Sequence, residues 1–170
     1  YYTLNNIPEG PAHEHDTMEA PDAETVEAHR GDGYTKKITK MPEDWNGTAD
    51  RNIQIKTQTG LKFDTELVEV KAGSRVALTL IIEDDMLHNL VITEPGMADA
   101  VGGAAMRLGL DGPTMEYAPD MGEVLFHTSL LEPQDRETIY FTAPDTPGDY
   151  DFVCTFPGHH FSMRGILRVQ

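Results

Sequence analysis

The chain has 170 residues and carries 29 acidic against 13 basic side chains, a formal net charge of -16 at pH 7. Binding to nucleic-acid phosphates needs clustered Lys and Arg, so this composition argues against a nucleic-acid partner and favours a basic or neutral one. A single cysteine excludes an intrachain disulfide, and no apolar run approaches the roughly 20 residues of a membrane-spanning helix.

The N-terminal part of the chain differs in composition from the rest. Residues 8–32 are polar and acidic with little apolar periodicity, which is typical of a linker or an extended arm. Residues 20–30 are expected to form a short helix, and Trp45 is expected to anchor the end of the arm. We therefore predict an extension or linker over residues 1–50 and one domain over residues 51–170.

From about residue 51 the pattern is that of short β-strands separated by turns. Residues 52–57 alternate apolar and polar side chains, as a strand with one buried face does. Residues 75–82 form a more continuous apolar run. Further strand segments are expected over residues 62–64, 67–70, 87–93, 123–131, 137–143, 150–154 and 165–169.

A helical insert interrupts these strands. Between residues 94 and 120, apolar side chains recur at helical spacing, at Met97, Val101, Ala104, Ala105 and Leu108, and a Gly- and Pro-containing loop follows. Turn signals every ten or so residues indicate Greek-key connections. The prediction is an all-β fold, a Greek-key β-sandwich of seven to eight strands with one helical insert.

The most informative segment is CTFPGHHFSM, which places Cys154, His159 and Met163 within ten residues between two strands. A thiolate and a thioether together favour copper, and two imidazoles with one thiolate and a weak axial Met mark an electron-transfer copper site. The second imidazole is expected from His88, at the start of a strand after a polar turn. A strand end can reach a loop at the same end of a sandwich.

Other interpretations of these residues were weighed. A Cys nucleophile with a His base would need an orienting residue and an oxyanion hole, and no such set is recognisable. Structural zinc prefers four Cys or His ligands, and Met is a poor zinc ligand. His160 and His127 are expected at the surface, and the His-Glu-His run at residues 13–15 is expected to be part of a solvated linker.

The ligand segment resembles that of the azurins and the related auracyanins, in the cupredoxin family. The resemblance rests on the Cys-x4-His-x3-Met spacing, on the dipeptide His88-Asn89 within MLHNLVI, and on the helical insert after that strand. It extends over residues 51–170. Azurins carry a disulfide near the start of the domain, which this chain cannot form, and a Gly where this chain has Leu87. Both departures favour the auracyanin branch.

The resemblance implies one type 1 (blue) copper ion per chain, held by His88, Cys154, His159 and Met163, that transfers single electrons without enzymatic chemistry. It implies redox proteins as transient partners and a periplasmic or other extracytoplasmic location. The extension would then be a membrane tether or a junction to a larger protein. Because the chain begins with Tyr, we expect that a targeting segment has been removed. A copper domain of a larger redox enzyme and a copper storage or transfer protein are the alternatives.

The resemblance also assigns roles around the metal. The Asn89 side chain would join the two ligand loops through the backbone of Thr155, and the N–H groups of Asn89 and Phe156 would point at the Cys154 sulfur. Leu87 would present its carbonyl to the metal. Electrons would pass through the edge of His159, within an exposed apolar patch of Met86, Pro157, Gly158 and Phe161.

Overall fold

The computed structural model describes residues 36–170. The chain divides into two units, residues 1–30 and 31–170, and every described residue belongs to the second. The helix expected over residues 20–30 and the histidine run at residues 13–15 lie outside the described residues. None of the described helices has the length and apolar character needed to cross a membrane.

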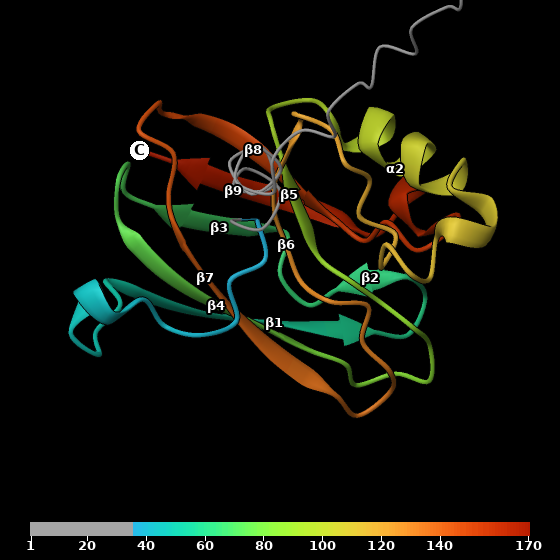
Figure 1. Ribbon diagram of the computed structural model, residues 1–170, viewed down its shortest axis with the longest axis horizontal. Helices are drawn as coiled ribbons and strands as arrows, with labels where there is room; N and C mark the ends of the chain where they lie inside the picture. Colours follow the sequence, from blue (N-terminus) through green and yellow to red (C-terminus); the bar gives the residue numbers. More distant parts are fainter. Residues whose placement is uncertain (1–35) are drawn as a thin grey trace, which may run out of the picture. The chain divides into compact units, whose positions relative to one another are not determined.

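Two packed β-sheets form the body of the described unit (Figure 1). The four-stranded sheet has the order β2-β1-β4-β7, and the five-stranded sheet has the order β3-β9-β8-β5-β6. The strands are β1 (Arg51–Gln58), β2 (Lys62–Phe63), β3 (Leu67–Val70), β4 (Arg75–Ile81), β5 (Val91–Thr93), β6 (Val124–His127), β7 (Arg136–Thr142), β8 (Gly148–Val153) and β9 (Arg164–Val169). The all-β sandwich is confirmed. Residues 36–170 contain nine strands, of which β2 has only two residues.

Alternating side chains fill the space between the sheets. Ile53 and Ile55 of β1 pair in parallel with Leu78 and Leu80 of β4, and all four side chains are buried. Phe152 of β8 lies across the core from this pair of strands in the same apolar cluster. Burial of such side chains supplies the main driving force for folding, at about 1.5–3 kcal/mol each.

The predicted helical insert is confirmed as α2 (Ala98–Met106), followed by the 3₁₀ turn η2 (Gly109–Asp111). The helix lies at one end of the sandwich, against β8 and the 3₁₀ turn η3 (His159–Phe161) (Figure 1). Its buried residues are small, namely Ala98, Val101, Gly102 and Ala105. Small side chains allow the helix to approach its neighbours closely.

The predicted strand over residues 87–93 is shorter than expected. Regular pairing covers only β5, and His88 makes an isolated bridge with Leu131. The backbone of His88 therefore lies at the open end of the sandwich, outside the regular ladder. This position frees its side chain to face the loop after β8.

Residues 36–50 pack on the sandwich. The backbone carbonyls of Lys36 and Ile38 accept hydrogen bonds from the N–H groups of His127 in β6 and Tyr140 in β7. Trp45, in the 3₁₀ turn η1 (Glu43–Trp45), is buried with its ring 6.1 Å from that of Tyr140. The expected anchoring by Trp45 is confirmed.

Candidate metal centre

Three buried donor atoms converge at the end of β5 and β8. Sγ of Cys154 lies 3.7 Å from Nδ1 of His88 and 3.6 Å from Nδ1 of His159, and the three donor atoms lie within 4.8 Å of one another. Strand pairing explains this convergence. Val91 of β5 lies opposite Val153 of β8, so the segments just beyond this pair carry His88 and Cys154 to the same place.

The loop after β8 folds back on itself through backbone hydrogen bonds. The N–H of Cys154 donates to the carbonyl of Met163 at 3.0 Å, and the N–H of Met163 donates to the carbonyl of His159 at 2.9 Å. Gly158, with φ of 84°, adopts the left-handed conformation that lets η3 begin at His159. Met163 is fully buried in the same apolar cluster as Cys154.

The spacing of the three donors fits a single metal ion. With a metal–sulfur bond of about 2.3 Å, a metal–nitrogen bond of about 2.0 Å and trigonal angles, sulfur and nitrogen would be about 3.7 Å apart. The distances at Cys154 agree with this value. Two imidazoles, one thiolate and a neighbouring thioether form the donor set that copper prefers for electron transfer.

The electrostatic surroundings of the three donor atoms also favour the binding of a cation. Burial raises the pKa of the Cys154 thiol to about 12. Burial lowers the pKa of His159, and the neighbouring His88 lowers it further, which favours the neutral imidazole with a lone pair to donate. Within residues 36–170, no Lys or Arg is hydrogen-bonded to any of the three donors. A metal cation would displace the thiol proton and balance the thiolate.

Asn89 ties the two ligand segments together. Its side-chain oxygen accepts the N–H of Thr155 at 2.8 Å, as predicted, and its Nδ2 donates to the Thr155 hydroxyl at 2.8 Å and to the Glu116 carbonyl at 2.9 Å. The backbone N–H groups of Asn89 and Phe156 form hydrogen bonds to the Cys154 sulfur that lower the pKa of this thiol, against the larger effect of burial. Leu87 is half-buried beside these residues.

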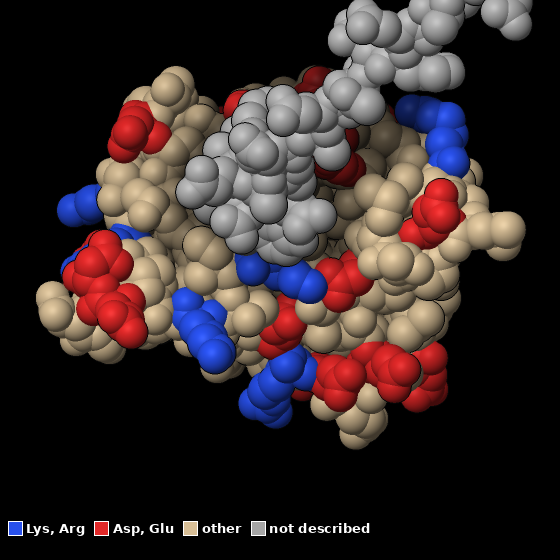
Figure 2. Space-filling model, viewed as in Figure 1, with Lys and Arg blue, Asp and Glu red and all other residues tan. Residues whose placement is uncertain are grey.

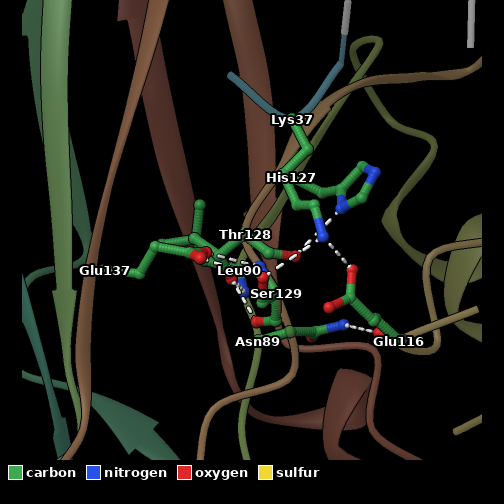
Figure 3. A network of polar contacts seen from close by, with 8 residues as sticks. All are labelled: Lys37, Asn89, Leu90, Glu116, His127, Thr128, Ser129 and Glu137. Carbon is green, nitrogen blue, oxygen red and sulfur yellow. Dashed lines mark hydrogen bonds and ion pairs between the residues drawn. The ribbon is translucent and has the colours of Figure 1, made fainter. Parts of the chain in front are cut away.

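A further layer of polar contacts surrounds Asn89. Lys37 donates to the Glu116 carboxylate at 2.6 Å and to the Ser129 hydroxyl at 3.2 Å (Figure 3). The Ser129 N–H and hydroxyl both donate to Glu137 (Figure 3). No residue pattern in the sequence indicates this layer. Glu116 adopts a positive φ of 55° without being Gly or Asn, so its residue type does not mark this turn of the backbone.

The expected surface position of His160 is wrong, and His127 is less exposed than expected. His160 is only 3% exposed, because Gly102 of α2 has no side chain and leaves room for its ring. Its Nδ1 has no hydrogen-bond partner among the described residues. His127 is half-buried with Nδ1 against the Thr128 carbonyl, and burial lowers its pKa.

The predicted electron-port residues differ in exposure. Phe161 is 70% exposed and Met86 is 44% exposed, which excludes a core position for either. Pro157 is exposed and Gly158 is half-buried. Pro157, Gly158 and Phe161 are near His159 in the chain, and the imidazole of His159 is itself nearly covered.

Comparisons with known proteins agree with this geometry. Residues 49–170 match the family model described as copper binding proteins, plastocyanin/azurin family. The chain is 32% identical to auracyanin-A of Chloroflexus aurantiacus over 65% of its own length and 68% of the relative, and 29% identical to azurin of Bordetella pertussis over 71% and 85%. The solved structure of auracyanin A, described as a "blue" copper protein, superposes with a TM-score of 0.64 at 28% identity, covering 71% of this chain and 98% of that one.

Proposed function

This chain belongs to the plastocyanin/azurin family of copper-binding proteins, and from that premise we propose that His88, Cys154, His159 and Met163 hold its copper ion. The protein is a cupredoxin electron carrier, not an enzyme, and the resemblance drawn from its sequence is confirmed. The observation that carries the ligand assignment is the convergence of three buried donors on one point. Met163, which is buried in the same apolar cluster as Cys154, would complete the donor set with its thioether.

The bound copper supplies a one-electron couple between Cu(I) and Cu(II). The role of the chain is to hold the donor atoms in fixed positions and to exclude water from them. Cys154 contributes its thiolate from the end of β8, and the loop hydrogen bonds to Met163 restrain it. Donors fixed in this way move little when the charge at the site changes, so little reorganisation opposes electron transfer. The N–H groups of Asn89 and Phe156 withdraw electron density from the sulfur, which favours the reduced state.

We also propose that electrons enter and leave through the edge of His159. The exposed apolar side chains of Met86 and Phe161 would be covered by a partner during brief contact, as small transient interfaces require. Several acidic side chains gather at the lower right of the face drawn in Figure 2. Together with the net charge of -16, they favour a redox partner with a basic or neutral docking face.

The arrangement of the whole chain is part of the proposal. Residues 51–170 would form the copper domain, and the preceding residues would be an extension that links or tethers it. Kinship with auracyanins and azurins supports work in the periplasm or in another extracytoplasmic space.

The visible spectrum of the copper-loaded, oxidised chain tests the ligand assignment. We expect an intense blue band that a mild reductant bleaches, and one copper per chain. Cys154→Ser should lose the band, whereas the matched control His127→Gln, which changes a half-buried histidine outside the donor set, should keep it. A wild-type chain without the band would refute the assignment. Two or more copper ions per chain would favour a storage protein or an enzyme domain.

A further inference from the structure

A buried carboxylate contacts the side of His88 that faces away from Cys154. Asp84 lies four residues before His88, in the turn between β4 and β5. Its Oδ1 and Oδ2 lie 2.8 and 2.9 Å from Nε2 of His88. The Asp84 side chain is only 9% exposed, and His88 is fully buried. The sequence had suggested no more than a polar turn at this place.

This contact fixes which nitrogen of His88 carries the proton. With Asp84 ionised and His88 neutral, Nε2 is the donor in this contact, because a carboxylate without a proton can only accept hydrogen bonds. Nδ1 is then left with a free lone pair, and it is Nδ1 that lies 3.7 Å from the Cys154 sulfur. Asp84 thus prepares His88 for a metal before any metal binds.

The backbone around Asp84 is held on both sides. The N–H of Glu83 donates to the Thr57 hydroxyl at 3.0 Å, and the N–H of Ile82 donates to the Asp135 carbonyl at 2.9 Å. On the far side, the backbone of His88 is bridged to Leu131. The carboxylate and the imidazole therefore meet through two restrained segments.

The negative charge of Asp84 also reaches the other donors. Burial raises the pKa of Cys154, and the charge of Asp84 raises it further. At His159, burial and the neighbouring His88 lower the pKa, while the Asp84 carboxylate opposes them. The Asp84 carboxylate therefore acts electrostatically on all three donor residues.

We propose that Asp84 is a positioning residue that orients His88 and lowers the reduction potential of the copper site, an inference that rests on the proposed function. A negative charge near the metal stabilises Cu(II) more than Cu(I). A carboxylate on Nε2–H also makes Nδ1 a stronger donor, with the same effect. Asp84 therefore acts against the N–H groups at the Cys154 sulfur, which favour Cu(I).

The reduction potentials of wild type, Asp84→Asn and Asp85→Asn test this proposal. Asn keeps the shape and one acceptor but removes the charge. Asp85 is exposed in the same turn, so its variant removes an equal charge without touching His88. Loss of a hydrogen-bond partner of a metal ligand changes metal affinity about tenfold or more. Because the lost charge stabilises Cu(II) more than Cu(I), the ratio of Cu(II) to Cu(I) affinity should fall about tenfold in Asp84→Asn. That fall corresponds to a rise of about 59 mV for a one-electron couple, and Asp85→Asn should shift far less.

A second readout needs no copper. Nitrogen chemical shifts of His88 in the metal-free protein report which ring nitrogen is protonated. The measurement is made at about pH 8, which is above the ordinary pKa of an imidazole. Wild type should show protonated Nε2. The Asn amide can also donate to Nε2, so Asp84→Asn should increase the form protonated at Nδ1.

The outcomes separate this inference from the function on which it rests. A wild-type chain without a reversible copper couple would overturn both. A normal wild-type couple with unchanged potential in Asp84→Asn, or with equal shifts in Asp84→Asn and Asp85→Asn, would overturn only the role of Asp84. Metal-free wild type protonated at Nδ1 of His88 would overturn the orienting role.

Discussion

Replacing Gly102 by alanine tests how α2 is joined to the metal loop. An added Cβ at this position would overlap the ring of His160 and lie 2.5 Å from the His160 Cβ. Gly103 is the matched control in the same helix, because a Cβ there meets only the mobile end of Arg107, at 3.4 Å.

The expected changes in the free energy of unfolding follow from two opposing effects. Exchanging a helical Gly for Ala gains up to ~1 kcal/mol from helix propensity. Overpacking a filled interior costs about 1–3 kcal/mol. We therefore expect Gly103→Ala to raise the free energy of unfolding by up to ~1 kcal/mol. Gly102→Ala should lower it by about 1 kcal/mol, which would separate the two midpoint temperatures by about 4–8 °C.

Thermal and urea unfolding of the metal-free chain measure these differences, and the blue band adds a functional readout. His160 lies between His159 and Phe161, so displacement of its ring should change the band in Gly102→Ala and leave it unchanged in Gly103→Ala. If both variants were equally stabilised, His160 could not occupy the space beside Gly102, and the account of its burial would be wrong.

Two further predictions concern hydrogen bonds. Asn89→Ala would leave the buried N–H of Thr155 without its partner, and we expect a loss of about 1–3 kcal/mol in urea unfolding of the metal-free chain. A loss below about 0.5 kcal/mol would show that Asn89 is not a structural tie. Asp50 accepts hydrogen bonds from the Arg75 side chain and backbone, which lower its pKa from 3.8 to about 2. This lowered pKa of Asp50 adds stability that is present above about pH 4 and is lost as the pH falls through 2. Asp50→Asn should therefore flatten the pH dependence of the free energy of unfolding between these values. A profile parallel to that of wild type would contradict the pairing of Asp50 with Arg75.

Candidate donors could be selected from the sequence because their chemistry is carried by residue type and spacing. Cys154, His159 and Met163 lie on one short loop, where local spacing alone limits the geometry. His88 had to come from elsewhere, and the strand pattern around it pointed to the correct end of the sandwich. Strand ends were less well predicted, because the ladder near His88 depends on its pairing with Leu131, which local periodicity does not encode.

The surroundings of the site could be predicted only in part. The contact between Asn89 and Thr155 followed from the family resemblance, whereas Asp84 went unnoticed because acidic residues in a turn are usually solvated. Burial of His160 depends on a glycine 58 residues earlier in the chain that only the folded helix brings near. Such contacts between distant segments leave no periodic trace in the sequence.

The position of the site within the sheet explains why its donors can be held rigidly. β5 and β8 are interior neighbours in the five-stranded sheet, so each is hydrogen-bonded on both sides. The antiparallel pair of Val91 and Val153 sets the separation of the segments that carry His88 and Cys154. Asn89 then joins these segments just beyond the point where the ladder ends. Motion of His88 relative to Cys154 would require breaking either the sheet or this buried bridge, so the fold itself limits the reorganisation of these two donors during electron transfer.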